Sequence, residues 1–276
     1  IDFKKVTVVG ETLSGPVQAL GTITATGPDA FVIDLTAPPA TLGMMGATMQ
    51  LAGAQLKATV ANKQISATAK LDLAKFEATD TAISNVKIDA TLEQASGVLK
   101  GAGTATLGAV SVKGTKLTGA QASASVESAA IDPAALDVAN LLAGLRKLQL
   151  SASTGEGAIS GTSWKKAELT ALIQPKGVGK SGGDITLAAD DVMLAQGAAG
   201  RVEIAGAIDI TEGVAGTAQG TARVHAAVIA APTRKQLVDA VALPLEAALP
   251  VFGAAAAKAI DRAALNFDVA APWSAT

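Results

Sequence analysis

The chain alternates apolar and polar side chains with a period of two residues, and this pattern constrains its fold more than any other feature. The segment Asn85–Glu93 reads NVKIDATLE, in which every second residue from Val86 is apolar. Successive side chains of a strand point to opposite faces, so the segment predicts a strand with one apolar and one solvated face. The same alternation recurs along most of the chain, punctuated by glycine, which predicts a mainly-β fold.

The residues that fill the apolar positions are unusually small. Hydrophobic residues make up 49% of the 276 residues, which argues against a disordered chain, and the length suits one large or two smaller β domains. Alanine, normally depleted in strands, occupies many strand positions, while Tyr is absent and only two Trp and five Phe occur. A face lined by small side chains either packs against another backbone or leaves room for a ligand.

Several functional classes have no support in the composition. The net charge is −2, and no basic patch is interleaved with aromatics, so we expect no nucleic-acid partner. The absence of cysteine excludes disulfides and thiolate metal sites. With one histidine and no cluster of catalytic side chains, we expect a protein that is not an enzyme and has no catalytic residue, metal or cofactor.

The chain is expected to be a mature form or a piece of a longer protein. It begins in a strand-like pattern at Ile1, without a signal-peptide pattern, and no stretch approaches about 18 uninterrupted apolar residues.

Two segments have helical signals. Asp132 is a good N-cap before Pro133, and an apolar stripe with period near 3.6 predicts a helix over about 133–145. A second stripe predicts a helical region over 233–264, divided or kinked by Pro244 and Pro250.

Turn signals divide the rest of the chain into strands. Gln55–Val60 and Gln64–Leu73 are expected to form a hairpin around residues 61–63, and Val98–Leu107, Val110–Leu117 and Ala120–Glu127 are expected as strands that glycines separate or bend. A weak internal similarity with a period near 80 suggests repeat units 1–82, 83–165 and 166–231, followed by a helical segment 232–264, all within one continuous portion 1–276.

Three local features are candidates for chemistry, and each has a simpler reading. Gly177–Gly182 ends like a phosphate-binding loop, but Gln174 stands where that motif needs glycine, so a plain hairpin loop is expected. His225 alternates with its neighbours and is expected to be a solvated strand residue. Asp190 and Asp191 are read as a turn, since neighbours in a strand would point to opposite faces. Trp164 and Trp273 are read as edge or interface aromatics.

The long apolar face is the feature most relevant to function. It could be the sealed core of two packed sheets, or the lining of a wide, curled sheet that holds acyl chains, because ligand sites are concave and mostly apolar. The residues expected to line such a groove are those on the apolar parity of three strands: Ile65, Ala67, Ala69, Leu71, Val86, Ile88, Ala90, Leu92, Val202, Ile204, Ile208 and Ile210. A structural or adhesive extracellular protein of the solenoid or passenger type, without lipid cargo, is the alternative.

The Gly-punctuated, alternating segments Val6–Val9, Val86–Leu92, Ala167–Ile173 and Val202–Ile210, together with the helical segment Thr233–Ala264, resemble a known family. They are similar to the periplasmic AsmA-like proteins, in particular the YdbH/TamB type of bridge-like lipid-transfer protein.

The resemblance implies a fold and a role. The fold would be a long twisted antiparallel sheet curled into an open, taco-like groove. The function would be non-enzymatic transport of phospholipids between the inner and outer membranes during outer-membrane biogenesis. The location would be the periplasm, with an inner-membrane anchor outside this chain and small envelope lipoproteins as partners.

Overall fold

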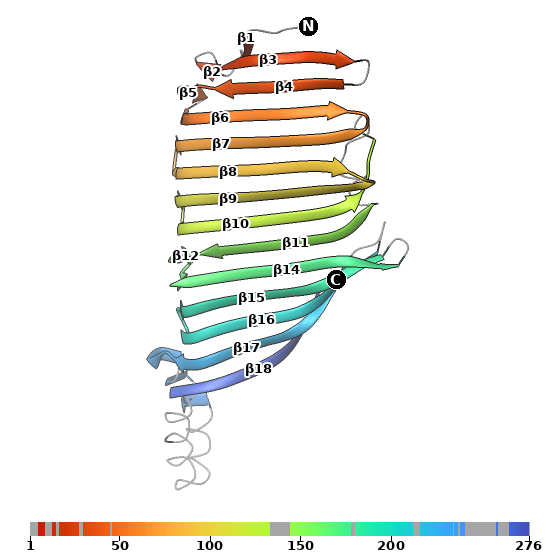
Figure 1. Ribbon diagram of the computed structural model, residues 1–276. Coiled ribbons are helices and arrows are strands. Elements are labelled where there is room, and N and C mark those ends of the chain that lie inside the picture. The colour runs from red at the N-terminus through yellow and green to blue at the C-terminus, as the bar shows by residue number, and fades with distance from the viewer. Residues whose placement is uncertain are drawn as a thin grey trace.

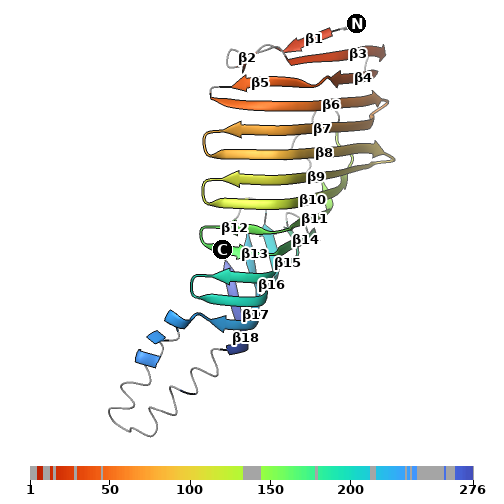
Figure 2. The ribbon, with the colours of Figure 1, turned by 90° about the vertical axis from the view of Figure 1, so that its left-hand side faces the viewer.

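The computed structural model describes residues 5–8, 13–14, 17–27, 30–44, 46–132, 144–177, 180–211, 216–233, 235–236, 238–240, 258 and 265–275. Within these ranges the chain forms one 18-stranded sheet, and every pairing in it is antiparallel (Figure 1). The strands follow one another in chain order like rungs, and β14–β18 bend at one end, so the sheet is curled (Figures 1 and 2). The expected mainly-β fold with one curled antiparallel sheet is confirmed.

The N-terminal strands are β1 (Lys5–Val8), β2 (Leu13–Ser14), β3 (Val17–Gly27), β4 (Ala30–Ala37) and β5 (Ala40–Met44). The long central strands are β6 (Ala47–Ala61), β7 (Gln64–Ala78), β8 (Thr81–Ala95), β9 (Val98–Val112) and β10 (Thr115–Ala129). The following strands are β11 (Leu145–Thr154), β12 (Gly157–Ile159), β13 (Thr162–Trp164) and β14 (Lys166–Gly177). The C-terminal strands are β15 (Lys180–Leu194), β16 (Gly197–Thr211), β17 (Thr217–Ile229) and β18 (Leu265–Ala275).

The central strands repeat with a fixed length. Each of β6–β10 has 15 residues, and a two-residue turn brings the next strand back, so their first residues are 47, 64, 81, 98 and 115, a spacing of 17. Asn62 and Lys63 both have positive φ (51° and 61°), as a type I′ turn requires, because its twist matches that of the strands it joins. The expected hairpin around residues 61–63 is confirmed. The units of about 80 residues remain a prediction beside this shorter spacing.

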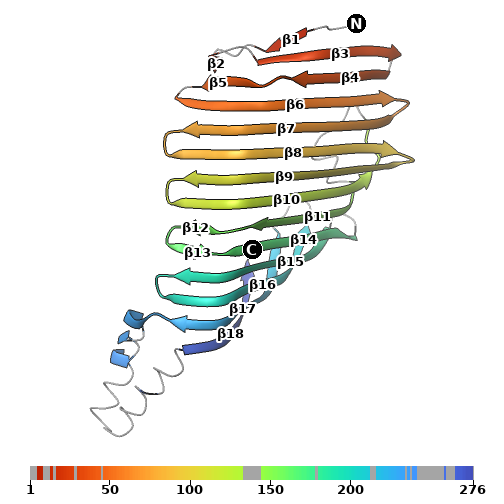
Figure 3. The same cartoon turned by 60° about the vertical axis from the view of Figure 1, so that its left-hand side comes forward.

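A line of irregular residues, which we call the crease, crosses the sheet and bends the strands. It includes the prolines between β4 and β5, the breaks between β11 and β12 and between β13 and β14, and residues in the left-handed region inside β8, β10, β15 and β17. In Figure 3, β12 lies end to end with β11, and β13 lies end to end with β14. The crease residues with positive φ are Asn85 (54°), Gly119 (58°), Asp191 (51°) and Ala226 (51°). Because these interruptions lie on neighbouring strands, the strands bend together and stay paired.

Two predicted strand boundaries at the crease are wrong. Gly108 and Gly119 lie inside β9 and β10 rather than between strands, and the chain reverses at Lys113 and Gly114 instead. The sequence shows a glycine at both kinds of position, and only the pairing of β8, β9 and β10 distinguishes a bend from a turn.

The most buried part of the central strands lies at one strand end. Directly opposed residues there form a row in which Val60 is 9% exposed, Ile65 6%, Gln94 3%, and Leu99 and Ser128 0%. The side chain of Gln94 forms hydrogen bonds with the backbone of Ile131, just after the end of β10. Its Nε2 donates to the carbonyl oxygens of Lys63 and Ile131 (both 2.8 Å), and its Oε1 accepts from the Ile131 N–H (2.8 Å).

The helical predictions are tested only in part. Residues 231–233, 235–236, 238–240 and 258 are helical, in agreement with the predicted region 233–264, whose other residues lie outside the described part of the chain. Residues 133–143 of the first predicted helix also lie outside it. At the end of that helix, Gly144 is in a turn and Leu145 begins β11, because Leu145 pairs with Ser128 of β10.

The crease can be tested at Gly119, where an added Cβ would have no atom within 4 Å and only the backbone conformation opposes a side chain. We expect Gly119→Ala to lower the free energy of unfolding by about 1–2 kcal/mol, the cost of the left-handed region for an L-residue. Gly103→Ala in β9 is the control, since its Cβ would make ordinary contacts at 3.6–4.0 Å. Equal urea-unfolding midpoints for the two variants would refute a specific conformational role for Gly119.

The role of the Gln94 hydrogen bonds can be tested by the substitution Gln94→Leu. The variant leaves the N–H and C=O of Ile131 without their side-chain partner, so we expect a loss of about 1–3 kcal/mol and faster amide exchange at Ile131. Gln121→Leu, on an exposed position of β10, is the control and should change stability by less than about 0.5 kcal/mol. Unchanged exchange at Ile131 in Gln94→Leu would contradict the assignment.

Candidate functional site: a two-faced sheet

One face of the sheet, which we call the apolar face, is lined by aligned rows of aliphatic side chains. The pairing registers place twelve residues directly opposite one another across twelve strands. This apolar row consists of Ala37, Ala54, Leu71, Ile88, Ala105, Ala122, Ala152, Leu169, Leu187, Ile204, Ala222 and Ala271. At about 4.8 Å between strands, the row is roughly 50 Å long.

The opposite face is polar over most of its extent. The residues one position along from the apolar row also oppose one another, and they include Asp72, Lys87, Thr106, Gln121 and Glu203. Directly opposed ions form surface pairs there, such as Lys70–Asp89 at 3.3 Å and Lys87–Asp72 at 3.4 Å. Such exposed pairs contribute little stability but favour one register over a slipped one.

Large side chains on the apolar face are open to solvent. Ile88 is 39% exposed, Leu187 38% and Leu71 37%, although each lies in the middle of its strand. Leu56, Leu150 and Ile210 share this face and are 36–40% exposed. Within the described residues no second sheet covers these side chains, so a sealed two-sheet core is not what this part of the chain forms. Isolated exposed leucines are ordinary in proteins, but aligned rows of them indicate a contact surface.

All twelve residues predicted to line a groove lie on the apolar face. Those of β7 and β8 oppose one another, as in the pairs Leu71–Ile88 and Ala69–Ala90. Those of β16 join them through the apolar row, because Ile204 opposes Leu187 of β15. Their side chains are partly exposed except that of Ile65, which belongs to the buried row. Whether they contact a lipid remains a proposal.

The rings of the two tryptophans lie over glycines on the apolar face. A Cβ at Gly157 of β12 would come within 2.3 Å of the ring of Trp164 on the neighbouring β13, and one at Gly206 of β16 within 2.6 Å of the ring of Trp273, which reaches across β17 from β18. The Trp164 indole donates to Thr154 Oγ1 (2.9 Å), whereas the buried Trp273 Nε1 has no acceptor among the described residues. Trp273 lies in the last strand of the sheet, consistent with an edge aromatic.

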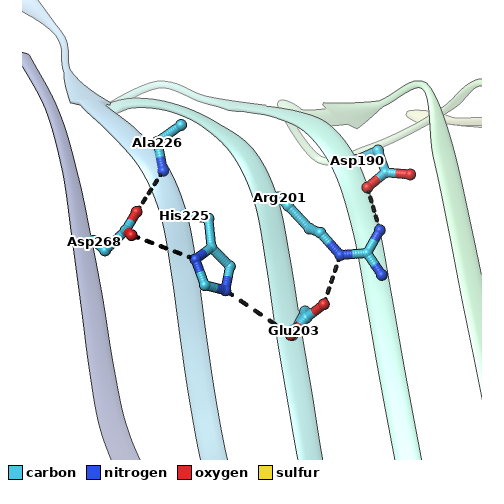
Figure 4. A network of polar contacts seen from close by, with 6 residues as sticks. All are labelled: Asp190, Arg201, Glu203, His225, Ala226 and Asp268. Atoms are coloured by element: carbon cyan, nitrogen blue, oxygen red, sulfur yellow. Dashed lines mark hydrogen bonds and ion pairs between the residues drawn. The ribbon is translucent and has the colours of Figure 1, made fainter.

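A network of charged residues joins the last four strands on the polar face (Figure 4). Arg201 donates to Asp190 Oδ1 (2.7 Å) and to Glu203 Oε1 (2.6 Å). His225 lies between two carboxylates, with Nε2 at 3.9 Å from Glu203 Oε2 and Nδ1 at 3.6 Å from Asp268 Oδ2. Asp268 also accepts from the N–H of Ala226 (2.9 Å), a crease residue.

The network favours ionised carboxylates. The hydrogen bond from Arg201 is the main cause that lowers the pKa of Glu203 below its ordinary value. The Ala226 N–H is the main cause that lowers the pKa of Asp268. The same contacts with Glu203 and Asp190 raise the pKa of Arg201. The carboxylates of Glu203 and Asp268 and the guanidinium of Arg201 are therefore charged at neutral pH.

The structure corrects the reading of Asp190 and Asp191. They lie inside β15 rather than in a turn, and Asp191 has the left-handed backbone of the crease. Asp190 pairs with Arg201, while Asp191 pairs with Lys165 at 3.0 Å. The simple alternation rule fails here because the left-handed residue interrupts it, and no local sequence signal marks that interruption.

The two other candidate features have the simpler structure that the sequence favours. Gly177 ends β14 and Lys180 begins β15, and the two residues oppose each other, so the glycine-rich segment is a hairpin. His225 lies in β17 with its side chain 41% exposed, as expected for a solvated strand histidine. Its carboxylate partners on β16 and β18 were not foreseen, because register alone brings them together.

Comparison with known proteins identifies no relative: no protein-family model, curated protein or solved structure matches the chain. Among the described residues, no group of three or more His, Asp or Glu side chains is arranged to hold a metal ion. None of the helices described is both long and apolar enough to cross a membrane.

Proposed function

We propose that the chain carries phospholipids without enzymatic chemistry, with their acyl chains lying on the apolar face of the sheet and their head groups in water. The observation that carries this proposal is the apolar row, in which all twelve opposed residues are Ala, Leu or Ile. The row crosses the strands, so an acyl chain that lies along it meets the same aliphatic chemistry on every strand.

The affinity would come from burial of apolar surface, which is worth about 25 cal/mol per Å2. The apolar row lacks hydrogen-bonding side chains, so it offers no polar group that would fix an acyl chain at one position. A surface of this kind favours sliding over tight binding at one site. In this proposal the chain acts in the periplasm between the inner and outer membranes, with an anchor and envelope lipoprotein partners outside the described residues, as in the YdbH/TamB type that the sequence resembles.

A structural role without lipid cargo is the competing function. The solenoid form of that alternative finds little support, because stacked β-helical coils pair in parallel, whereas the pairings here are antiparallel. A structural protein would need its exposed apolar face covered by another protein. The two functions therefore differ in what contacts Ile88, Leu71 and Leu187.

The lipid contact can be tested with photoreactive phospholipids and the purified protein. We expect cross-links at apolar-face positions of β7, β8, β15 and β16, and phospholipids in the mass spectrum of the purified protein. Absence of both lipid and cross-links would overturn the proposal and favour a structural role.

Substitution tests the same surface. We expect Ile88→Asp and Ile204→Asp to reduce cross-linking about tenfold or more, since a carboxylate in an apolar contact costs more than the 1.4 kcal/mol that equals a factor of ten. Thr91→Asp and Ala205→Asp are the controls, because they add the same charge to the polar face of the same strands. Circular dichroism shows whether each variant is folded, and equal cross-linking in all four variants would contradict the proposal.

A further inference from the structure

The two ends of the central strands differ in how their apolar residues are covered. The end at which β6 turns into β7 and β8 into β9 holds the buried row, in which Leu99 is fully buried. The other end carries the turns that join β7 to β8, β9 to β10, β12 to β13 and β15 to β16 (Figures 2 and 3). The Lys113 N–H donates to the Asp80 carbonyl of the next turn, and the Ser160 N–H to the Gly114 carbonyl (both 3.2 Å). These turns therefore line one edge of the sheet.

The last residue of three strands at this edge is apolar and open to solvent. Val112 of β9 is 39% exposed, Ile159 of β12 43% and Leu194 of β15 47%, and we call these three residues the rim. The register aligns them, because Thr115 of β10 opposes both Val112 and Ile159. The buried Val192 continues the apolar face of β15 beyond the crease, and Leu194 lies two residues further on the same face.

The hairpin tip between β15 and β16 is apolar on both of its faces. Met193 precedes Leu194 in β15 and points to the opposite face, where it is 62% exposed. Met193 also opposes Ser163 of β13, which places this tip beside the β12–β13 hairpin. A tip with large apolar side chains on both faces is suited to enter an apolar medium rather than to lie flat on a polar surface.

The charges beside the rim are close to balanced. The charged residues that line the two hollows next to it are Lys113, Lys116, Lys165, Glu77, Asp80, Glu156 and Asp191. Of these, Asp191 pairs with Lys165 at 3.0 Å, and Glu77 pairs with Lys75 at 2.7 Å. Among the described residues the rim therefore has no excess charge that would select a strongly charged partner. Apolar contact is the interaction that it offers.

We propose that the rim is the place at which phospholipids enter and leave the apolar face, through shallow insertion of its side chains into a lipid bilayer. The inference rests on the proposed function and adds a route to it. From Val112 inward along β9 the apolar face continues with Val110, Leu107 and Ala105, the last of which belongs to the apolar row. An acyl chain that crosses the rim thus meets aliphatic side chains up to that row.

A bilayer fits the rim better than a protein surface does. Burial of apolar side chains in lipid is not directional, so separate hairpin tips can contribute without a partner of matching shape, whereas protein interfaces depend on close complementary packing. Interfacial segments bury their apolar residues about 5–10 Å into the boundary between head groups and acyl chains. Two strand residues span about 7 Å, so insertion to this depth covers the rim and reaches the next apolar residue of each strand.

Flotation with phosphatidylcholine vesicles tests the contact. We expect the wild-type protein to float with the vesicles, and Ile159→Asp and Leu194→Asp each to lower its partitioning about tenfold or more, because a carboxylate is costly in an apolar medium. Ser96→Asp adds the same charge in the exposed turn at the opposite strand end and should leave flotation unchanged. High salt should also leave it unchanged, since the charges beside the rim are balanced.

Two ways of supplying the photoreactive phospholipid separate the rim from the lipid cargo itself. The rim variants should lose cross-links to lipid supplied in vesicles but keep those to lipid supplied in detergent micelles. Ile88→Asp, on the apolar face, should still float and yet lose cross-links from both sources. Equal flotation of wild type and rim variants, with cross-links intact, would overturn the rim and leave the proposed function standing. Absence of cross-links from either source would refute the lipid cargo and with it the route.

Sedimentation without vesicles tests a protein contact at the same residues. We expect the sedimentation coefficient of the wild-type protein to be independent of its concentration and equal to that of Leu194→Asp. Self-association that Leu194→Asp abolishes, in a protein that does not float with vesicles, would assign the rim to a second copy of the chain and overturn the proposal.

Discussion

Antiparallel pairing in a constant register is the interaction on which the rest of this structure depends. Directly opposed residues in paired strands point to the same face, so a register kept from strand to strand turns local alternation into continuous rows. In β6–β10 the 15-residue strands and two-residue turns keep that register. A slip of one residue would put polar side chains, such as Lys87 in β8 or Glu203 in β16, into the apolar row.

The crease is compatible with this pairing because it crosses neighbouring strands at matching positions. An isolated left-handed residue in one strand would break the ladder with its neighbours. Here Asn85 and Gly119 lie on either side of Gly108 of β9, so each of these left-handed residues has a glycine beside it on the adjacent strand. The strands bend together, and apolar residues resume beyond the bend at a spacing of three, as with Ile83 and Val86. The buried Val192, Ala199 and Ala227 show that the apolar face continues across the crease.

The two faces have separate physical roles. The polar face holds cross-strand ion pairs that are exposed and individually weak, and at the C-terminal end they become a connected network around Arg201 and His225. The apolar face has no comparable polar contact along its row, and its large side chains remain partly exposed. A surface that combines a precise register with little local specificity suits the proposed lipid cargo.

The sequence by itself determined the mainly-β fold and, within each regular stretch of strand, which face a side chain takes, because alternation is a property of neighbouring residues. The twelve predicted residues therefore lie on one face, and the hairpins around Asn62 and after Gly177 were predictable from turn residues. The tertiary structure alone decided that Gly108 and Gly119 bend strands rather than end them, since both roles use the same residue. It also decided that Asp190, Arg201, Glu203, His225 and Asp268 meet. These residues come from four strands, β15 to β18, and only the register of those strands, set by all their pairings at once, brings their charges together.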